Sequence, residues 1–164
     1  MKIRPAEAGD VPRLLEIYNH YVEHTHVTFD LEPVSLESRM KWFAGFSDQG
    51  PHRLFVASDG ADLIGYASSG VFRSKPAYAR SVETSIYLAH DRVGTGAGTA
   101  LYAHLLDGLA AEPEAHRAYG GVAIPNEASL ALHQRCGFKR VATFSEAGFK
   151  FGRYWDVTWF ERSV

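Results

Sequence analysis

The fold of this chain is decided by the stretch Val82-Glu83-Thr84-Ser85-Ile86-Tyr87-Leu88, followed closely by Arg92-Val93-Gly94-Thr95-Gly96-Ala97-Gly98-Thr99-Ala100-Leu101-Tyr102. An alternating apolar run that carries one carboxylate ends at a cluster of glycines, and an amphipathic helix begins directly after it. This order predicts a strand, a phosphate-binding turn and a helix. It places a potential base, Glu83, beside an anion site.

The glycine cluster has the backbone freedom that a phosphate-binding turn needs. Gly94, Gly96 and Gly98 lack a Cβ, so the chain can turn sharply and direct successive N–H groups at one ligand. A helix expected from Gly98 to about Ala111 would add unpaired N–H groups and the positive end of its dipole at the same place. One face of that helix is expected to pack on a sheet, because leucines recur at helical spacing at Leu101, Leu105, Leu106 and Leu109.

Two nucleotide-binding motifs and an ordinary loop compete with this interpretation. A P-loop requires Gly-Lys-Ser/Thr at the end of the turn, whereas Gly98-Thr99-Ala100 has no lysine. A dinucleotide-binding fold requires GxGxxG, whereas the spacing here is Gly94-x-Gly96-x-Gly98 and too little sequence follows the turn. Taken alone, the cluster is also compatible with a purely structural loop.

Length and composition indicate one globular domain. The chain has 164 residues, of which 46% are hydrophobic, and no linker or repeat divides it, so we expect residues 1–164 to form a single domain. Its net charge is −2 with both signs interspersed, which gives no support for nucleic-acid binding. The single cysteine, Cys136, excludes an intrachain disulfide, and no signal peptide or long apolar span is found. We therefore expect a soluble cytoplasmic protein.

Strand and helix patterns alternate along the remaining chain. Strand patterns occur at Lys2–Ala6, Leu54–Ser58, Leu63–Ser69, Tyr119–Ile124, Lys139–Phe144 and Trp155–Arg162. A first helix is expected to run to about Glu23 with Asp10 as its N-cap, and a second begins near Ser35. A short third helix is expected over Ala128–Arg135, closed by Gly137.

Several further motifs lie outside the central stretch. The longest is the run Pro125-Asn126-Glu127-Ala128-Ser129-Leu130-Ala131-Leu132-His133-Gln134-Arg135-Cys136-Gly137-Phe138. Others are Ile17-Tyr18-Asn19-His20-Tyr21, Thr28-Phe29 and Gly148-Phe149-Lys150-Phe151-Gly152. In this order, and over nearly the whole chain, the motifs resemble the GNAT superfamily of acetyl-CoA-dependent N-acetyltransferases, most closely its phosphinothricin and methionine sulfoximine acetyltransferase branch. The resemblance implies an α/β (α+β) fold with a central mixed, mostly antiparallel twisted sheet of six to seven strands flanked by about four helices.

The resemblance implies acetyl-CoA as cosubstrate and assigns residues to it. The pyrophosphate would bind main-chain N–H groups of Val93, Gly94, Thr95, Gly96, Ala97, Gly98 and Thr99. The pantetheine amides would meet the strand backbone at Ile86, Tyr87 and Leu88. Asn126 matches a position that contacts the cofactor arm, although a helix N-cap fits its sequence context equally well.

The turn departs from the family pattern in its side chains. The family usually begins it with Gln or Arg and a second Arg, where this chain has Val93 and Gly94, and Arg92 lies one residue early. We therefore expect binding to depend chiefly on main-chain donors, with Arg92 as a possible additional contact.

Acetyl transfer requires a neutral amine and an acceptor for its proton. By resemblance, Glu83 is the general base, acting directly or through a water, whereas the residues alone also allow an ion pair with Arg73 or Arg80. The resemblance makes His133 the second catalytic candidate, donating a proton to the leaving thiolate or a hydrogen bond to the reacting carbonyl. The alternative for His133 is a packed helix histidine. For Cys136, a small buried residue is favoured over a nucleophile.

A small amino-acid acceptor needs a cation for its carboxylate and polar groups near the base. The resemblance implies a substrate pocket formed by Phe29, Arg73, Ser74, Lys75, Tyr78, Thr84 and Ser85. Arg73 is the expected carboxylate clamp, because a guanidinium binds two oxygens at once, and Lys75 is equally compatible with surface charge. His24 and His26 form a pair without a third ligand nearby, so we expect no metal site.

The leading hypothesis is an acetyl-CoA-dependent enzyme that acetylates the α-amino group of a small amino acid or analogue, such as phosphinothricin, methionine sulfoximine or methionine sulfone. A polyamine acceptor would favour an acidic pocket, and a protein N-terminus would need an open groove. A non-catalytic acyl-CoA-binding sensor is the remaining alternative, which the presence of Glu83 and His133 disfavours.

The last part of the chain is rich in aromatic residues. They are Phe149, Phe151, Tyr154, Trp155, Trp159 and Phe160. Alternating positions are expected to face the core, although pocket walls and subunit contacts are also compatible with this composition. The resemblance implies a homodimer with the acceptor pocket near the subunit boundary.

Overall fold

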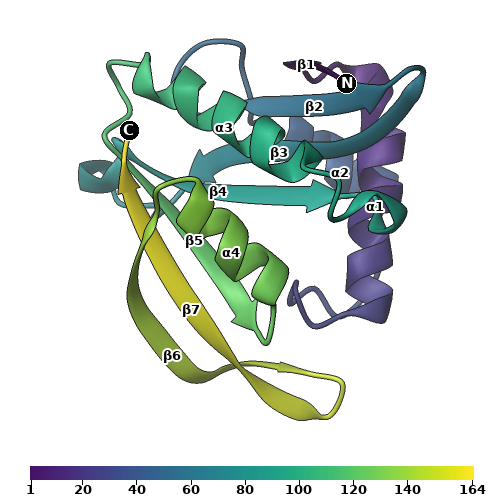
Figure 1. Cartoon of the computed structure of the whole chain (residues 1–164), viewed down its shortest axis with the longest axis vertical. Coiled ribbons are helices and arrows are strands. Elements are labelled where there is room, and N and C mark those ends of the chain that lie inside the picture. Colours follow the sequence, from purple (N-terminus) through teal and green to yellow (C-terminus); the bar gives the residue numbers. More distant parts are fainter.

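The seven strands form one sheet in the order β1-β2-β3-β4-β5-β7-β6 (Figure 1), in a computed structural model that describes all 164 residues. The strands are β1 (Lys2–Pro5), β2 (Leu54–Asp59), β3 (Asp62–Val71), β4 (Ser81–Leu88), β5 (Arg117–Ile124), β6 (Lys139–Lys150) and β7 (Arg153–Ser163). Neighbouring strands are antiparallel except for β4 and β5, which are parallel. The predicted mixed, mostly antiparallel sheet is confirmed.

Four α-helices flank the sheet. They are α1 (Val11–His24), α2 (Leu36–Phe43), α3 (Ala97–Ala110) and α4 (Glu127–Arg135). Short 3₁₀ turns are η1 (Ala8–Asp10), η2 (Pro76–Tyr78) and η3 (His90–Arg92). None of the helices has the length and apolar character needed to span a membrane.

Two of the predicted helix boundaries have the expected side-chain or backbone signals. Ser35 caps α2, because its hydroxyl accepts from the Ser38 N–H at 3.2 Å. Gly137 follows α4 with a φ of +78°, which glycine adopts without strain. Asp10 precedes α1 as predicted, but the expectation that its carboxylate caps the helix is wrong. That carboxylate instead accepts two hydrogen bonds from the Arg4 guanidinium, at 2.7 and 2.8 Å, which ties β1 to η1.

Each face of the sheet has its own hydrophobic core. On one face, the leucine stripe of α3 predicted from the sequence is fully buried against the strands, at Leu101, Leu105, Leu106 and Leu109. On the other face, α1 contributes Leu14 and Ile17, which pack with Val56 and Tyr66 of the sheet. Because successive strand residues point to opposite faces, the two cores alternate along β4.

The sheet opens between its two parallel strands. Residues of β4 pair with β5 only from Ser81 to Glu83, opposite Arg117 to Tyr119. Beyond Glu83 the strands separate while each remains paired on its other side, to β3 and to β7 respectively. This leaves one edge of β4 and one edge of β5 without a strand partner in the middle of the sheet (Figure 1).

The β6–β7 hairpin extends past the helix layers at its outer end (Figure 1). Phe160, in the inner half of β7, is 1% exposed and belongs to the core, as the alternation predicts. Phe149, Phe151 and Tyr154 are more than half exposed, so the core expectation is wrong for these three side chains. Gly148 and Lys150 face the Thr28–Phe29 segment, so Phe149 between them points to the opposite face of the hairpin. Alternation alone cannot indicate where a hairpin leaves the body of the protein.

Candidate active site

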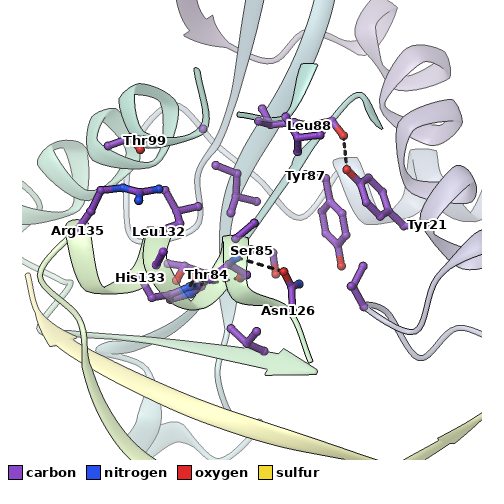
Figure 2. Close-up of a pocket in the computed structure, with 18 of the residues that line it drawn as sticks. Tyr21, Thr84, Ser85, Tyr87, Leu88, Thr99, Asn126, Leu132, His133 and Arg135 are labelled. Atoms are coloured by element: carbon purple, nitrogen blue, oxygen red, sulfur yellow. Dashed lines mark hydrogen bonds between the residues drawn. The ribbon is translucent and has the colours of Figure 1, made fainter. Parts of the chain in front are cut away.

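The main cavity occupies the opening between β4 and β5 and has a volume of about 570 Å³. Its walls are the separated strand edges, the glycine turn before α3, and one face of α4 (Figure 2). Twelve of the residues predicted from the sequence line it, namely Thr84, Ser85, Ile86, Tyr87, Leu88, Val93, Gly94, Gly96, Gly98, Thr99, Asn126 and His133. The turn and the strand that lie adjacent in sequence therefore lie on one cavity.

The glycine turn has the backbone conformation of an anion site. Gly94 and Gly96 have φ values of +82° and +85°, in the left-handed region that favours glycine. Gly96 is the N-cap of α3 and supplies no side-chain cap, so the first N–H groups of that helix remain free for a ligand. Gly98 allows the helix to approach β4 closely, because a Cβ there would lie 3.2 Å from Leu88 Cδ1.

Three side chains of the turn face away from the main cavity. The Thr95 hydroxyl donates to the Arg92 carbonyl at 3.0 Å, and the methyl group of Ala97 is buried in the core. The Arg92 guanidinium lies 3.7 Å from Asp59 and 3.8 Å from Asp62, on the β2–β3 turn. The idea that Arg92 replaces the missing basic side chain of the turn therefore has no support in the geometry.

Arg135, which the sequence interpretation missed, brings a cation to the main cavity from α4. It lies on the same helix face as Ala128, Ala131 and Leu132, which also line the cavity. Figure 2 shows Arg135 and Leu132 on this face. The spacing i, i+3, i+4, i+7 of these four positions is the signal that would have identified it.

Two hydrogen bonds fix the mouth of the main cavity. The Tyr21 hydroxyl donates to the Leu88 carbonyl at 2.8 Å, which ties α1 to the end of β4 (Figure 2). Asn126 Oδ1 accepts from the Ser129 N–H at 3.1 Å, so this residue is the N-cap of α4 while also lining the cavity. Capping and ligand contact are thus compatible at Asn126.

His133 is 4% exposed and both of its ring nitrogens have protein partners. Nδ1 donates to the Ser129 carbonyl at 2.8 Å, and Nε2 lies 3.2 Å from the Tyr102 hydroxyl. Burial lowers the pKa of the imidazole, while the bond to Ser129 opposes this shift. The neutral ring carries its proton on Nδ1, so Nε2 is an acceptor for the single proton of the Tyr102 hydroxyl, which Thr84 Oγ1 also faces.

This network continues to the floor of the opening. The Tyr102 oxygen lies 2.7 Å from Thr84 Oγ1, and the Thr84 hydroxyl lies 3.0 Å from the Tyr119 carbonyl on β5. Tyr102, which the sequence interpretation did not single out, therefore links α4, β4 and β5 at the point where the strands separate. Gly120 makes room for it, because a Cβ there would overlap the His133 ring.

Glu83 is the last residue of β4 that pairs with β5. Its carboxyl group is half-buried, and this burial raises its pKa, although the Arg73 charge opposes the shift. No salt bridge joins Glu83 to Arg73 or Arg80, so the purely structural ion pair is not formed. Glu83 does not itself line the main cavity, but it directly precedes Thr84, which does, so this carboxylate lies where the two strands begin to separate.

The other predicted acceptor residues lie outside the main cavity. Arg73, Ser74 and Lys75 are exposed on the β3–β4 connection, where the Arg73 guanidinium lies 5.0 Å from the centre of the Phe72 ring. Tyr78 is exposed and packs edge-on against the same ring. Phe29 lies over Gly148 of the hairpin, where a Cβ would overlap its ring. The structure thus brings Arg73 close to Glu83 and places Phe29 against β6.

A second cavity, the Arg39 cavity, lies on the sheet face that α1 and α2 cover and has a volume of about 330 Å³. It is lined by Tyr18, Asp30, Val34, Ser38, Arg39, Trp42, Tyr66, Ser68, Ser85 and Tyr87. Ser85 and Tyr87 line the main cavity as well, so these two β4 residues separate the two spaces.

Cysteine and histidine positions complete the inventory of reactive groups. Cys136 is buried, and burial raises the pKa of its thiol, which confirms the prediction of a small buried residue. His26 stacks on Trp155 with ring centres 4.0 Å apart, and its Nε2 lies 2.9 Å from the Pro125 carbonyl. No group of three or more His, Cys, Asp or Glu side chains is placed to hold a metal ion.

Comparison with known proteins agrees with this geometry. The sequence profile described as acetyltransferase (GNAT) domain matches residues 3–159. The chain is 51% identical to phosphinothricin N-acetyltransferase of Streptomyces coelicolor, over 100% of this chain and 96% of that protein. It is 36% identical to L-methionine sulfoximine/L-methionine sulfone acetyltransferase of Pseudomonas paraeruginosa, over 99% of this chain and 94% of that protein.

A solved structure extends the comparison to three dimensions. The crystal structure of phosphinothricin acetyltransferase from Sinorhizobium meliloti in complex with acetyl-CoA superposes with a TM-score of 0.92 at 30% identity, covering 99% of this chain and 88% of that one. Sequence profile, relatives and fold agree over nearly the entire length. The chain belongs to the GNAT family of N-acetyltransferases.

Proposed function

We propose that this enzyme transfers the acetyl group of acetyl-CoA to the α-amino group of a small amino acid or analogue, such as phosphinothricin, methionine sulfoximine or methionine sulfone. The observation that carries the proposal is Glu83, a half-buried carboxylate with a raised pKa at the point where β4 and β5 separate. The relatives named after these substrates support the choice of acceptor class.

The main cavity fits the donor. Its glycine turn offers free N–H groups and a helix N-terminus for a pyrophosphate, at Val93, Gly94, Thr95, Gly96, Ala97, Gly98 and Thr99. Arg135 adds a cation on the opposite helix, and Asn126 adds an amide at the mouth. The strand edge at Ile86, Tyr87 and Leu88 offers main-chain groups to the pantetheine arm, with the Leu88 carbonyl already accepting from Tyr21.

Glu83 supplies the proton acceptor for the reaction. The α-amine of an amino acid is protonated near neutral pH and has no lone pair until that proton leaves. A carboxylate whose pKa is raised by burial takes the proton more readily than an ordinary glutamate. The neutral amine then attacks the thioester carbonyl, and the C–N bond forms as the C–S bond breaks. The attacking nitrogen loses its second proton in this step, the thiolate takes up one proton and leaves as the thiol, and Glu83 returns its proton to solvent.

His133 is the second residue of the proposed catalytic set. Its Nδ1–H is committed to Ser129 and its Nε2 accepts from Tyr102, an arrangement that supports a positioning role beneath Thr84. His133→Gln is expected to lower kcat about 10-fold while the shape of the pH–rate profile is kept. Loss of the basic limb of that profile would instead identify His133 as the proton donor to the thiolate.

The proposed acceptor residues lie mostly in an exposed region of the protein. Arg73 lies close enough to Glu83 to affect its pKa, so a carboxylate bound there would hold the adjacent α-amine near the base. Phe29, Ser74, Lys75, Tyr78 and Ser85 surround this region as proposed walls. Thr84 contributes its backbone, because its hydroxyl is committed to Tyr102 and Tyr119.

The test is an assay of free thiol release over a panel of amino acids and polyamines, with Glu83→Gln and Glu127→Gln compared. Glu127 is an exposed carboxylate in the first turn of α4 and serves as the matched control. Glu83→Gln is expected to lower kcat about 1,000-fold without changing acetyl-CoA affinity, since general-base catalysis contributes roughly 100- to 10,000-fold. Coenzyme A binding without acetylation of any small amine would overturn the proposal.

Assembly as a homodimer in the cytoplasm completes the proposal, with residues 1–164 as one domain. The exposed aromatic side chains of the hairpin, Phe149, Phe151 and Tyr154, are the surface that supports it, because such side chains are enriched at interfaces. Light scattering of the wild type and of Phe149→Ser/Tyr154→Ser is expected to give a dimer and a monomer respectively. A monomeric wild type would contradict the assembly.

A further inference from the structure

The Arg39 cavity contains a buried cation that neither the fold nor the proposed reaction explains. Arg39 is 5% exposed, yet the guanidinium makes a single hydrogen bond to protein, from Nη2 to the Tyr66 hydroxyl at 2.6 Å. Its Nε–H is buried and has no partner. Burying a charged group costs free energy unless its donors are satisfied, so an unpartnered donor on a cavity wall indicates a ligand.

Aromatic rings hold this guanidinium in one orientation. Its carbon lies 3.5 Å from the centre of the Trp42 ring, and 4.8 and 5.1 Å from the rings of Tyr18 and Tyr66. Stacking satisfies the faces of the planar group but leaves its N–H donors, which lie in the plane, for an acceptor. The rings therefore preorganise a donor fork without occupying it.

The remaining polar groups of the Arg39 cavity favour an oxyanion over a cation. Three serines line it, Ser38, Ser68 and Ser85, and the hydroxyl group of each can donate to an anionic oxygen. The one carboxylate, Asp30, belongs to an exposed residue and already accepts from the Tyr18 hydroxyl at 2.6 Å. Water screens that exposed charge, whereas the buried guanidinium is screened far less.

The Arg39 cavity lies on the face of β4 to which Glu83 points, where an acceptor could reach it. Residues 83, 85 and 87 of β4 point to one face of the strand, so Ser85 follows Glu83 on the side that faces Arg39. Ser85 and Tyr87 also line the main cavity, which places the Arg39 cavity across β4 from the proposed donor site. A substrate whose amine lies at Glu83 can extend along this face toward Arg39.

We infer that the Arg39 cavity is an oxyanion subsite for the side chain of the acceptor, and that the Arg39 guanidinium binds a phosphinate, carboxylate or similar group there. The inference rests on the proposed function and extends it to the acceptor's far end. The α-carboxylate of the acceptor would bind Arg73 near Glu83. An acceptor with two acidic groups would then bind one arginine with each group, Arg73 with the α-carboxylate and Arg39 with the side-chain oxyanion. Arg39 thereby sets substrate preference without taking part in proton transfer.

The experiment compares phosphinothricin, whose side chain ends in a phosphinate, with methionine, whose side chain has no oxyanion. Arg39→Gln is expected to lower kcat/KM for phosphinothricin about 100-fold and for methionine less than about 3-fold, because a charge-assisted bond is lost for only one of them. Arg39→Lys, which keeps the charge but loses the planar fork, is expected to give an intermediate loss. Lys41→Gln, on the exposed face of α2, is the matched control and leaves the preference unchanged.

Calorimetric binding of phosphinothricin to the enzyme saturated with coenzyme A separates this inference from the proposed function. Binding by the wild type that Arg39→Gln abolishes supports the subsite, even if no acceptor is acetylated. Failure of the wild type to bind phosphinothricin, or an equal loss for both acceptors in Arg39→Gln, would overturn it and leave Arg39 with a structural role.

A second variant guards against misfolding of Arg39→Gln. Ser68→Asp adds a carboxylate to the lining of the same cavity, where it is expected to pair with the guanidinium and fill the subsite without removing the arginine. Phosphinothricin binding is expected to fall at least about 30-fold with thermal stability kept. Unchanged phosphinothricin affinity in this variant would contradict the assignment.

Discussion

The main cavity and the Arg39 cavity share two β4 residues but are built from different parts of the chain. The main cavity is formed by backbone, namely two separated strand edges and a turn with glycines at positive φ. The Arg39 cavity is formed by side chains, with a guanidinium, four aromatic rings and three serines around it. A backbone site is damaged by adding atoms, whereas a side-chain site is damaged by removing them. We therefore expect the main cavity to tolerate Val93 and Gly94 and the Arg39 cavity to set selectivity.

Among substitutions that add atoms, the largest effect is expected where the new side chain overlaps the rigid floor between the strands. In Gly120→Val, the new side chain would overlap the His133 ring, which cannot retreat because both nitrogens are hydrogen-bonded and Phe160 stacks on it. Overpacking of this kind costs about 1–3 kcal/mol, so we expect a lower melting temperature together with a loss of kcat/KM of about 100-fold. Calorimetry and steady-state kinetics test this, and a variant with wild-type values for both would contradict the packing.

The next effect contrasts backbone and side chain within the turn itself. Gly96→Val forces a β-branched residue to a φ of +85°, and the resulting strain of about 1–2 kcal/mol is expected to weaken acetyl-CoA binding about 10- to 30-fold. Val93→Ala removes side-chain atoms from the same turn and is expected to change affinity less than about 2-fold. Equal losses of acetyl-CoA affinity in the two variants, measured by a binding titration, would show that side chains form the anion site.

A smaller effect is expected on the acceptor side. Gly148→Ala would push its Cβ into the Phe29 ring, which is partly exposed and can swing away, so we expect KM for the acceptor to rise about 5-fold while KM for acetyl-CoA is unchanged. Gly9→Ala is the control, because a Cβ there meets nothing within 4 Å. A rise in both KM values would place Phe29 outside the proposed acceptor region.

The smallest effect concerns the pH dependence of the base. Glu83 acts in its ionised form and burial raises its pKa, so kcat/KM is expected to fall as the pH drops through that raised pKa. Arg73 favours the ionised carboxylate, so Arg73→Gln raises the pKa further and moves the acid limb to higher pH. Because Arg73 is exposed and screened, the shift is expected to stay below about one pH unit. A shift to lower pH would contradict the assignment.

The features formed by the backbone could be predicted from the sequence. Glycine spacing, the leucine stripe of α3 and the strand pattern around Glu83 are local signals, and they identified the turn, the core face and most of the main cavity lining. Arg135 escaped because its role depends on which face of α4 meets the opening. The ion pairs of Arg92 were equally hidden, because its carboxylate partners lie on the β2–β3 turn, some thirty residues earlier in the chain.

The features formed by side chains could not be predicted from local patterns. Arg39 lies in a short helix of mixed polarity, where a single arginine is expected on the solvent side. It is buried where α2 packs against α1 and β3, with the Tyr18 and Tyr66 rings against its guanidinium. In the same way, Phe149, Phe151 and Tyr154 read as core positions until the length of the β6–β7 hairpin is known.

The separation of β4 from β5 has a thermodynamic consequence beyond catalysis. A donor molecule that bonds to the free strand edges supplies the hydrogen bonds that a neighbouring strand would otherwise make. Any ligand that binds only the folded chain raises the free energy of unfolding by RT ln(1 + [L]/Kd). Amide exchange along Ser85–Leu88 should slow when coenzyme A is added, and resistance to proteolysis should increase with it. The lifetime of this protein in a cell is thereby linked to the supply of its own donor.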